Sequence, residues 1–121
     1  MGIKGLDHVN INTSNMKDTL SFYVDLLDFT DGFRPPFDFP GAWLYAGGNA
    51  VIHLVFSDCE PKVICNPVDH IAFEASDFEE TKQRLENANW EFRCSSVPDT
   101  QIRQIFHFDP NGVKLELNFK F

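Results

Sequence analysis

A four-residue motif occurs twice in this sequence, once near the N-terminus and once near the middle. The first copy reads Leu-Asp-His-Val at residues 6–9, and the second reads Val-Asp-His-Ile at residues 68–71. In both copies apolar and polar residues alternate, which is the period of a strand with one buried face. The two histidines, His8 and His70, are 62 positions apart (70 − 8), about half of the 121 residues. A repeat of that length predicts a chain built from two similar halves.

Each half also ends in an apolar run that carries a second potential metal ligand. The run at 50–56 contains His53, and the run at 113–119 contains Glu116. The spacing from His8 to His53 is 45 positions (53 − 8), and from His70 to Glu116 it is 46 (116 − 70). Imidazole nitrogens and carboxylate oxygens both bind divalent metal ions. Each half therefore carries, at matching spacing, two side chains that can bind a metal ion.

Between these runs, the pattern in each half predicts a helix and further strands. Helical spacing of apolar residues predicts a helix to about residue 28, and Asp77 with Glu80 forms a capping box for a second helix to about residue 88. The residues Asp-Pro-Asn-Gly at 109–112 predict a turn between the last two strands. Strands are expected at 5–13, 43–45, 50–56, 91–97, 102–108 and 113–119. A further strand is expected to start at Val68. Each half is thus predicted to be a βαβββ module, which is an α+β fold.

Composition restricts the partners and the compartment of the chain. The net charge of −8 disfavours nucleic acid and anionic membranes, since both attract basic surfaces. No apolar run approaches the 18 or so residues of a transmembrane helix, and the N-terminus lacks the apolar core of a signal peptide. The cysteines, Cys59, Cys65 and Cys94, are odd in number and lack close metal-site spacing. We therefore expect a cytoplasmic protein with reduced thiols.

Taken together, these motifs resemble the vicinal oxygen chelate superfamily, which includes glyoxalase I, extradiol dioxygenases, fosfomycin-resistance transferases and bleomycin-binding proteins. The resemblance covers almost the whole chain and is carried by the paired modules, the strand-borne His8 and His70, and the hairpin that leads to Glu116. It implies a single glyoxalase-like domain at 1–121. Modules 5–56 and 68–119, joined by a linker at 57–67, are expected to form a curved mixed sheet around a cleft.

The resemblance also implies a metal site. It makes His8, His70 and Glu116 ligands of a divalent ion, expected to be Zn, Ni, Co, Mn or Fe(II). His53 lies where glyoxalase I has a fourth ligand, commonly Glu, and this departure puts a glyoxalase reaction in doubt. Glu116 is expected to be catalytic as well, because a ligand carboxylate can dissociate and move a proton.

A Pro- and Phe-rich loop at 34–41 is expected to select the substrate. An arginine beside aromatic residues suits an anionic or carbonyl-bearing ligand, and two later positions match cleft-facing positions of the family. The expected substrate-binding residues are Arg34, Phe37, Phe39, Trp43, Thr100 and Gln104. The remaining histidine, His107, is expected to be an exposed strand residue.

Three functions fit these residues. The favoured one is a metal-dependent lyase, isomerase or transferase acting on a small substrate that chelates the ion through vicinal oxygens. The second is an extradiol-type dioxygenase with Fe(II) on His8, His70 and Glu116, although such enzymes are typically longer. The third is a metal-free small-molecule binding protein of the bleomycin-resistance type. In each case a homodimer is expected, with sites shared between chains as one arrangement.

Overall fold

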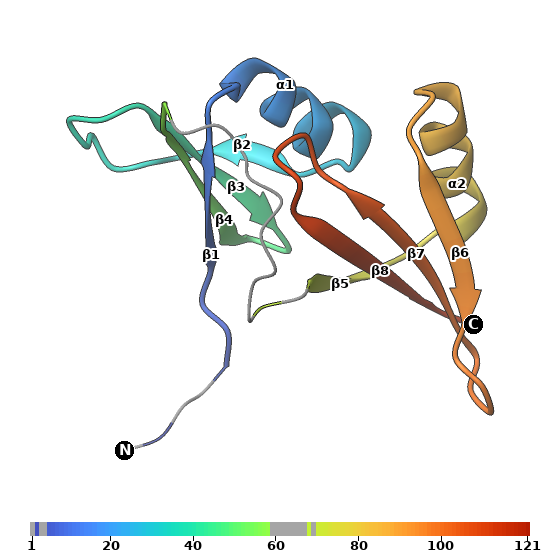
Figure 1. Cartoon of the computed structure of the whole chain (residues 1–121). Coiled ribbons are helices and arrows are strands. Elements are labelled where there is room, and N and C mark those ends of the chain that lie inside the picture. The colour runs from blue at the N-terminus through green and yellow to red at the C-terminus, as the bar shows by residue number, and fades with distance from the viewer. Residues whose placement is uncertain (1, 3–4, 59–67, 69) are drawn as a thin grey trace. The chain divides into compact units, whose positions relative to one another are not determined.

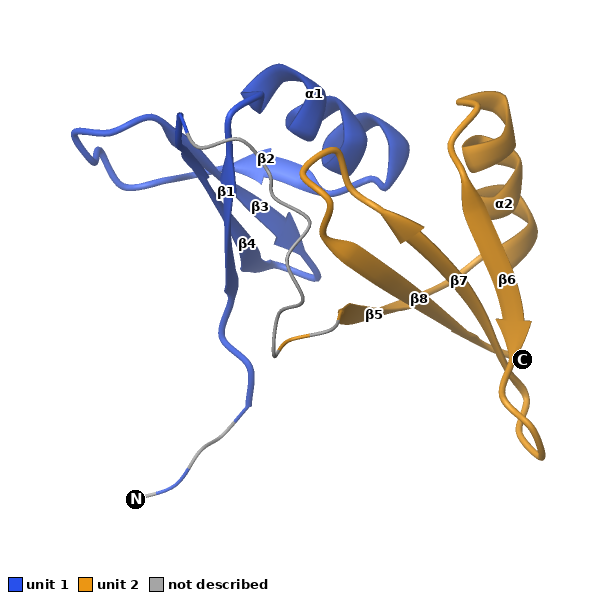
Figure 2. Cartoon of the chain, in the orientation of Figure 1, with its two compact units in different colours: residues 1–61 blue, residues 62–121 orange. Residues whose placement is uncertain are grey.

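A computed structural model gives the structure of this chain and describes residues 2, 5–58, 68 and 70–121. The chain divides into two compact units, Met1–Pro61 and Lys62–Phe121 (Figure 2). Of the predicted linker 57–67, only residues 57 and 58 lie in the described part, and Cys59 and Cys65 lie outside it. That the two units form one domain around a cleft therefore stays a prediction.

The first unit contains a four-stranded mixed sheet and one helical segment (Figure 1). Its elements are β1 (Val9–Thr13), α1 (Met16–Leu20), the π-helical η1 (Ser21–Leu26), β2 (Thr30–Gly32), β3 (Gly41–Ala46) and β4 (Asn49–Phe56). The strand order is β1-β4-β3-β2, with β1 parallel to β4 and the other pairs antiparallel.

The second unit repeats this topology. Its elements are β5 (Ile71–Ala75), α2 (Phe78–Asn87), β6 (Phe92–Ser96), β7 (Ile102–Phe108) and β8 (Lys114–Lys120). The strand order is β5-β8-β7-β6, with β5 parallel to β8. The predicted α+β fold with two βαβββ modules is therefore confirmed.

The repeat extends to the register of the strands. In the first unit Asn10, two residues after His8, pairs with His53. In the second unit Ala72, two residues after His70, pairs with Glu116. His53 and Glu116 thus occupy equivalent positions of the two sheets. His53 lies on β4, which pairs with β1, the strand that follows His8. Glu116 lies on β8, which pairs with β5, the strand that follows His70.

Alternation along the strands separates a buried face from a polar face in each sheet. The buried side chains of the second unit include Ile105, Leu115 and Phe119, and Leu85 of α2 is buried as well. His107 shares the parity of Ile105 and is only 1% exposed. The prediction of an exposed His107 is therefore wrong, because its strand position assigns it to the apolar face.

Three local predictions also need correction. Asp77 precedes α2 with φ of 63° and makes no side-chain capping bond, so the capping box does not form. The single helix predicted to about residue 28 changes to π-helical hydrogen bonding at Ser21. The strand β2 was not located from the sequence, because Thr30–Gly32 is too short for a period to emerge.

None of the helices in the described ranges is long and apolar enough to cross a membrane.

Candidate metal and substrate site

Two of the predicted ligands meet in the first unit. His8 immediately precedes β1, and His53 lies on the neighbouring β4. Their rings stack with centroids 3.7 Å apart and planes 11° apart. Trp43 of β3 also stacks on His53, with centroids 4.0 Å apart. His8 Nδ1 lies 2.7 Å from the carboxylate of Asp7, which orients the His8 ring.

The surroundings of His53 favour its neutral form. Burial and the neighbouring His8 lower the pKa of His53 from its ordinary value of 6.5, outweighing opposite contributions from the Ala50 backbone and Asp7. A histidine must be neutral to bind a metal ion. The lowered pKa of His53 therefore favours the form that a metal ion requires.

The other two predicted ligands meet in the second unit. His70 immediately precedes β5, and Glu116 lies on the neighbouring β8. His70 Nε2 is 3.2 Å from Glu116 Oε1. Two ligands that each lie about 2.1 Å from one ion, at an angle near 100°, have a similar separation. The donor types and the spacing of this pair thus fit a divalent ion.

Each unit therefore contributes one pair: two imidazoles in the first, one imidazole and one carboxylate in the second. In the described part of the chain, neither pair forms a group of three or more His, Cys, Asp or Glu that could hold a metal ion. The meeting of the four groups at one ion stays a prediction.

The predicted substrate-binding residues of the first unit also gather beside His53. The Arg34 guanidinium lies 5.0 Å from the ring centroids of both Phe37 and Phe39, and Arg34 Nη2 donates to the Phe39 carbonyl at 2.9 Å. The Phe37 ring lies 6.3 Å from Trp43, which stacks on His53. Loop and imidazole pair thus form one continuous cationic and aromatic surface.

The two predicted residues of the second unit differ in position. Thr100 lies in the turn before β7, where its hydroxyl donates to the Val97 carbonyl at 2.8 Å. Gln104 lies on the same face of the sheet as Glu116, and its Nε2 donates to Asn118 Oδ1 at 3.2 Å. Asn118 in turn donates to Glu116 Oε2 at 2.7 Å. The sequence reasoning missed Asn118, although its position two residues after Glu116 places it on the same face.

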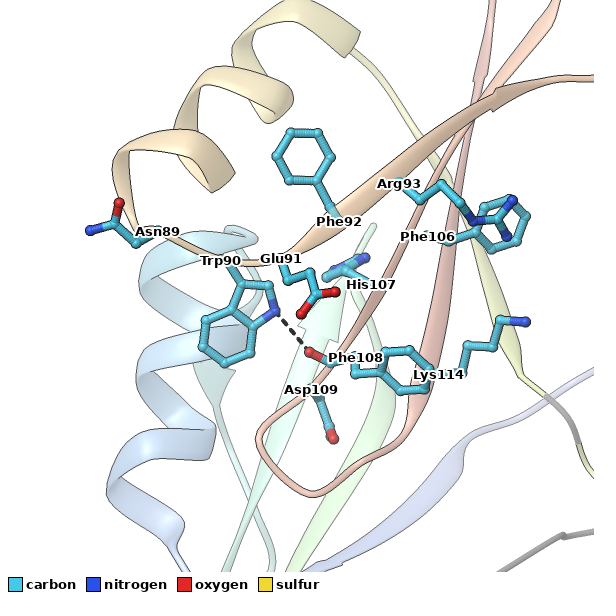
Figure 3. Close-up of a pocket in the computed structure, with 10 residues that line it drawn as sticks. All are labelled: Asn89, Trp90, Glu91, Phe92, Arg93, Phe106, His107, Phe108, Asp109 and Lys114. Atoms are coloured by element: carbon cyan, nitrogen blue, oxygen red, sulfur yellow. Dashed lines mark hydrogen bonds between the residues drawn. The ribbon is translucent and has the colours of Figure 1, made fainter. Parts of the chain in front are cut away.

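A separate cavity of about 610 Å³ lies beside this face of the second unit (Figure 3). It is bordered by Phe106, over whose ring Arg93 and Lys114 lie at 4.7 Å and 5.5 Å. Trp90 Nε1 donates to the Phe108 carbonyl at 2.8 Å, which holds the indole at the rim. His107 reaches the cavity from the apolar side, and burial lowers its pKa to about 4.

Comparison with known proteins agrees with this fold. Residues 5–117 match the family model described as Glyoxalase/Bleomycin resistance protein/Dioxygenase superfamily. The chain therefore belongs to this superfamily, whose members commonly use divalent metal ions.

Individual relatives match over most of the chain. The chain is 29% identical over 126 positions to Glyoxylase I 4 of Arabidopsis thaliana, covering 95% of this chain and 70% of that protein. It is 30% identical over 127 positions to the uncharacterized protein YaeR of Escherichia coli (strain K12), covering 97% of each. The crystal structure of a glyoxalase family protein from Enterococcus faecalis has a TM-score of 0.72 and 28% identity, covering 98% of this chain and 99% of that one.

Proposed function

We propose that the protein is a metal-dependent enzyme that acts as a lyase, isomerase or transferase on a small substrate with two adjacent oxygens. The observation that carries this proposal is the equivalence of His8 with His70 and of His53 with Glu116 in two sheets of matching register. Within each unit the two side chains lie in contact, His8 with His53 and His70 with Glu116. Four side chains of metal-binding type at matched positions of a repeated fold support a shared role in binding an ion.

The side chains divide the chemical work among them. When bound, a divalent ion supplies electrophilic polarisation of a substrate that chelates it through vicinal oxygens. The histidines would hold such an ion through imidazole nitrogens and Glu116 through a carboxylate oxygen. Glu116 is also the candidate to move a proton, because the residue is only 9% exposed and its carboxylate faces His70 and Asn118 at hydrogen-bond distance. The aromatic loop with Arg34 is placed to bind and orient the substrate from the first unit.

One observation favours the metal-free binding protein as a second candidate. Phe37 and Phe39 are 46% and 43% exposed and stack on each other with centroids 5.2 Å apart. An exposed aromatic surface of this kind suits capture of a planar ligand and needs no metal ion. The dioxygenase alternative uses the same ligands with Fe(II), and only its reaction distinguishes it.

Elemental analysis of protein purified without an affinity tag tests the proposal. We expect about one divalent ion per chain, loss of turnover after chelation, and recovery when the ion is returned. A panel of small hydroxy- and oxo-carbonyl compounds supplies candidate substrates, and oxygen uptake with catechols tests the dioxygenase. No metal bound at neutral pH, with ligand binding retained, would leave the binding protein as the function.

We also propose a cytoplasmic homodimer. Each sheet leaves two outer strands, β1 and β2 in the first unit and β5 and β6 in the second, and such edges are commonly covered by another chain. Sedimentation at micromolar concentration is expected to give a dimer. Sharing of sites is tested by mixing a His8→Ala/His53→Ala chain with a His70→Ala/Glu116→Gln chain: shared sites would restore metal binding in the hybrid. A monomer would reject the dimer, and hybrids without any recovered binding would reject sharing.

A further inference from the structure

Glu116 stands at the end of a chain of hydrogen bonds on the polar face of the second sheet. His70 Nε2 lies 3.2 Å from Glu116 Oε1, so one carboxylate oxygen faces the other predicted ligand. Asn118 Nδ2 donates to the second oxygen, Oε2, at 2.7 Å. Gln104 Nε2 donates to Asn118 Oδ1 at 3.2 Å. Both oxygens of the carboxylate are therefore engaged, and the orientation of the Asn118 amide is set by Gln104.

The strand register explains why these side chains meet. Glu116 and Asn118 are two residues apart on β8, so they lie on the same face of the sheet. Gln104 of β7 is the direct cross-strand partner of Asn118. Gln104 and Asn118 also line a depression of about 290 Å³ on this face. The amides thus line this depression and hold the carboxylate from one side.

The first unit provides an internal comparison. Its equivalent of Glu116 is His53, and the position two residues later is Val55. The cross-strand partner of Val55 is Gly41, just as the partner of Asn118 is Gln104. The same two positions of the repeated sheet therefore hold an amide pair beside the carboxylate and apolar residues beside the imidazole.

This difference follows from the chemistry of the two ligands. A carboxylate has two oxygens and rotates easily about its last bond, so it needs a donor to present one oxygen in a fixed direction. An imidazole ring is rigid, and stacking on Trp43 and His8 already holds that of His53. The amide pair therefore occurs in the repeat whose predicted ligand needs to be oriented.

We propose that Asn118 is the positioning residue of Glu116, and that Gln104 positions Asn118 in turn. This inference rests on the proposed metal-dependent function. Asn118 keeps Oε2 occupied and leaves Oε1 directed toward the side of His70, where an ion would be held. Gln104 acts on Glu116 only through Asn118, so loss of the Gln104 amide is expected to have a smaller effect than loss of the Asn118 amide.

Titration of the metal-free full-length protein with Co²⁺, followed by its visible absorption, tests this role. Asn118→Leu keeps the size of the side chain and removes the donor, and we expect it to weaken Co²⁺ binding by about 10- to 100-fold. The Co²⁺ spectrum should change as well, because the carboxylate is no longer held. Gln104→Leu should weaken binding by a smaller factor.

A matched control is available on α2, where Gln83 Nε2 donates to Asn87 Oδ1 at 3.0 Å. Asn87→Leu removes the same kind of amide pair far from Glu116 in the sequence and should leave Co²⁺ binding unchanged. A double-mutant cycle separates positioning from a structural role: in a Glu116→Gln background, Asn118→Leu should have little further effect.

The outcomes are distinct. If the wild-type protein binds no Co²⁺, the proposed function fails and this inference fails with it. If the wild-type protein binds Co²⁺ but Asn118→Leu changes neither affinity nor spectrum, only the positioning role is overturned. The same conclusion follows if the loss persists undiminished in the Glu116→Gln background or is matched by Asn87→Leu.

Discussion

Replacement of Glu116 by glutamine is expected to weaken the binding of Zn²⁺ by about 100-fold or more, beyond the loss expected for a residue that only supports a ligand. Glutamine has nearly the same size and can still accept a hydrogen bond, but it removes the negative charge contributed by the ligand set. The fold should survive, because Glu116 lies on the polar face, beside rather than within the apolar layer of Leu115 and Leu117. Calorimetric titration of the metal-free protein measures the effect.

Two further variants make this experiment decisive. Glu79→Gln removes an exposed carboxylate of α2 and should leave the affinity for Zn²⁺ unchanged. His53→Ala should weaken binding less than Glu116→Gln if His8, His70 and Glu116 form the essential triad. Equal affinities of the wild-type and Glu116→Gln proteins would exclude Glu116 as a ligand.

His107 is expected to make the stability of the protein strongly dependent on pH. Its folded-state pKa is lowered to about 4 because a 1% exposed side chain cannot be charged without loss of hydration. In the unfolded chain the same group binds a proton near its ordinary value of 6.5. The unfolded state therefore binds more protons between these values, so stability is fully present above about 6.5 and falls as the pH drops toward about 4.

The size of this effect is set by the separation of the two pKa values. With 6.5 and about 4 as the limits, His107 accounts for a loss of about 2 to 3 kcal/mol between about pH 7 and about pH 4.5. Urea unfolding at both pH values measures the total loss. His107→Leu should reduce that loss by about this amount, since leucine cannot titrate.

The other titrating groups are common to both proteins and cancel in this comparison. If His107→Leu and the wild-type protein lose the same free energy of unfolding on acidification, His107 does not control acid stability and its burial is not the cause.

The fold could be predicted from the sequence where the internal repeat marked equivalent elements in the two halves. The module order was predicted from the two histidine motifs, the apolar runs that follow them and the Asp-Pro-Asn-Gly turn. The same features predicted the strands β4, β7 and β8 to within a residue or two. The capping box failed because Asp77 adopts a left-handed conformation. The failure at His107 has a different cause, because the sequence leaves open the parity of a strand that ends at a turn.

The candidate site was predictable at the level of residue types but not of contacts. Spacing alone paired His8 with His53 and His70 with Glu116, because the first and last strands of each module are parallel neighbours in one sheet. Asn118 was missed because its role depends on a cross-strand partner, Gln104, whose register no sequence period specifies. Hydrogen bonds between a predicted ligand and residues of neighbouring strands can be identified only once the register of those strands is known.

X-ray absorption spectroscopy of the Zn²⁺-loaded protein tests most directly whether these side chains hold one ion. We expect a first shell of nitrogen and oxygen at about 2.0–2.2 Å with clear imidazole scattering, and one imidazole fewer in a loaded His70→Ala protein. A first shell without imidazole scattering, or identical spectra for the wild-type and His70→Ala proteins, would contradict this expectation.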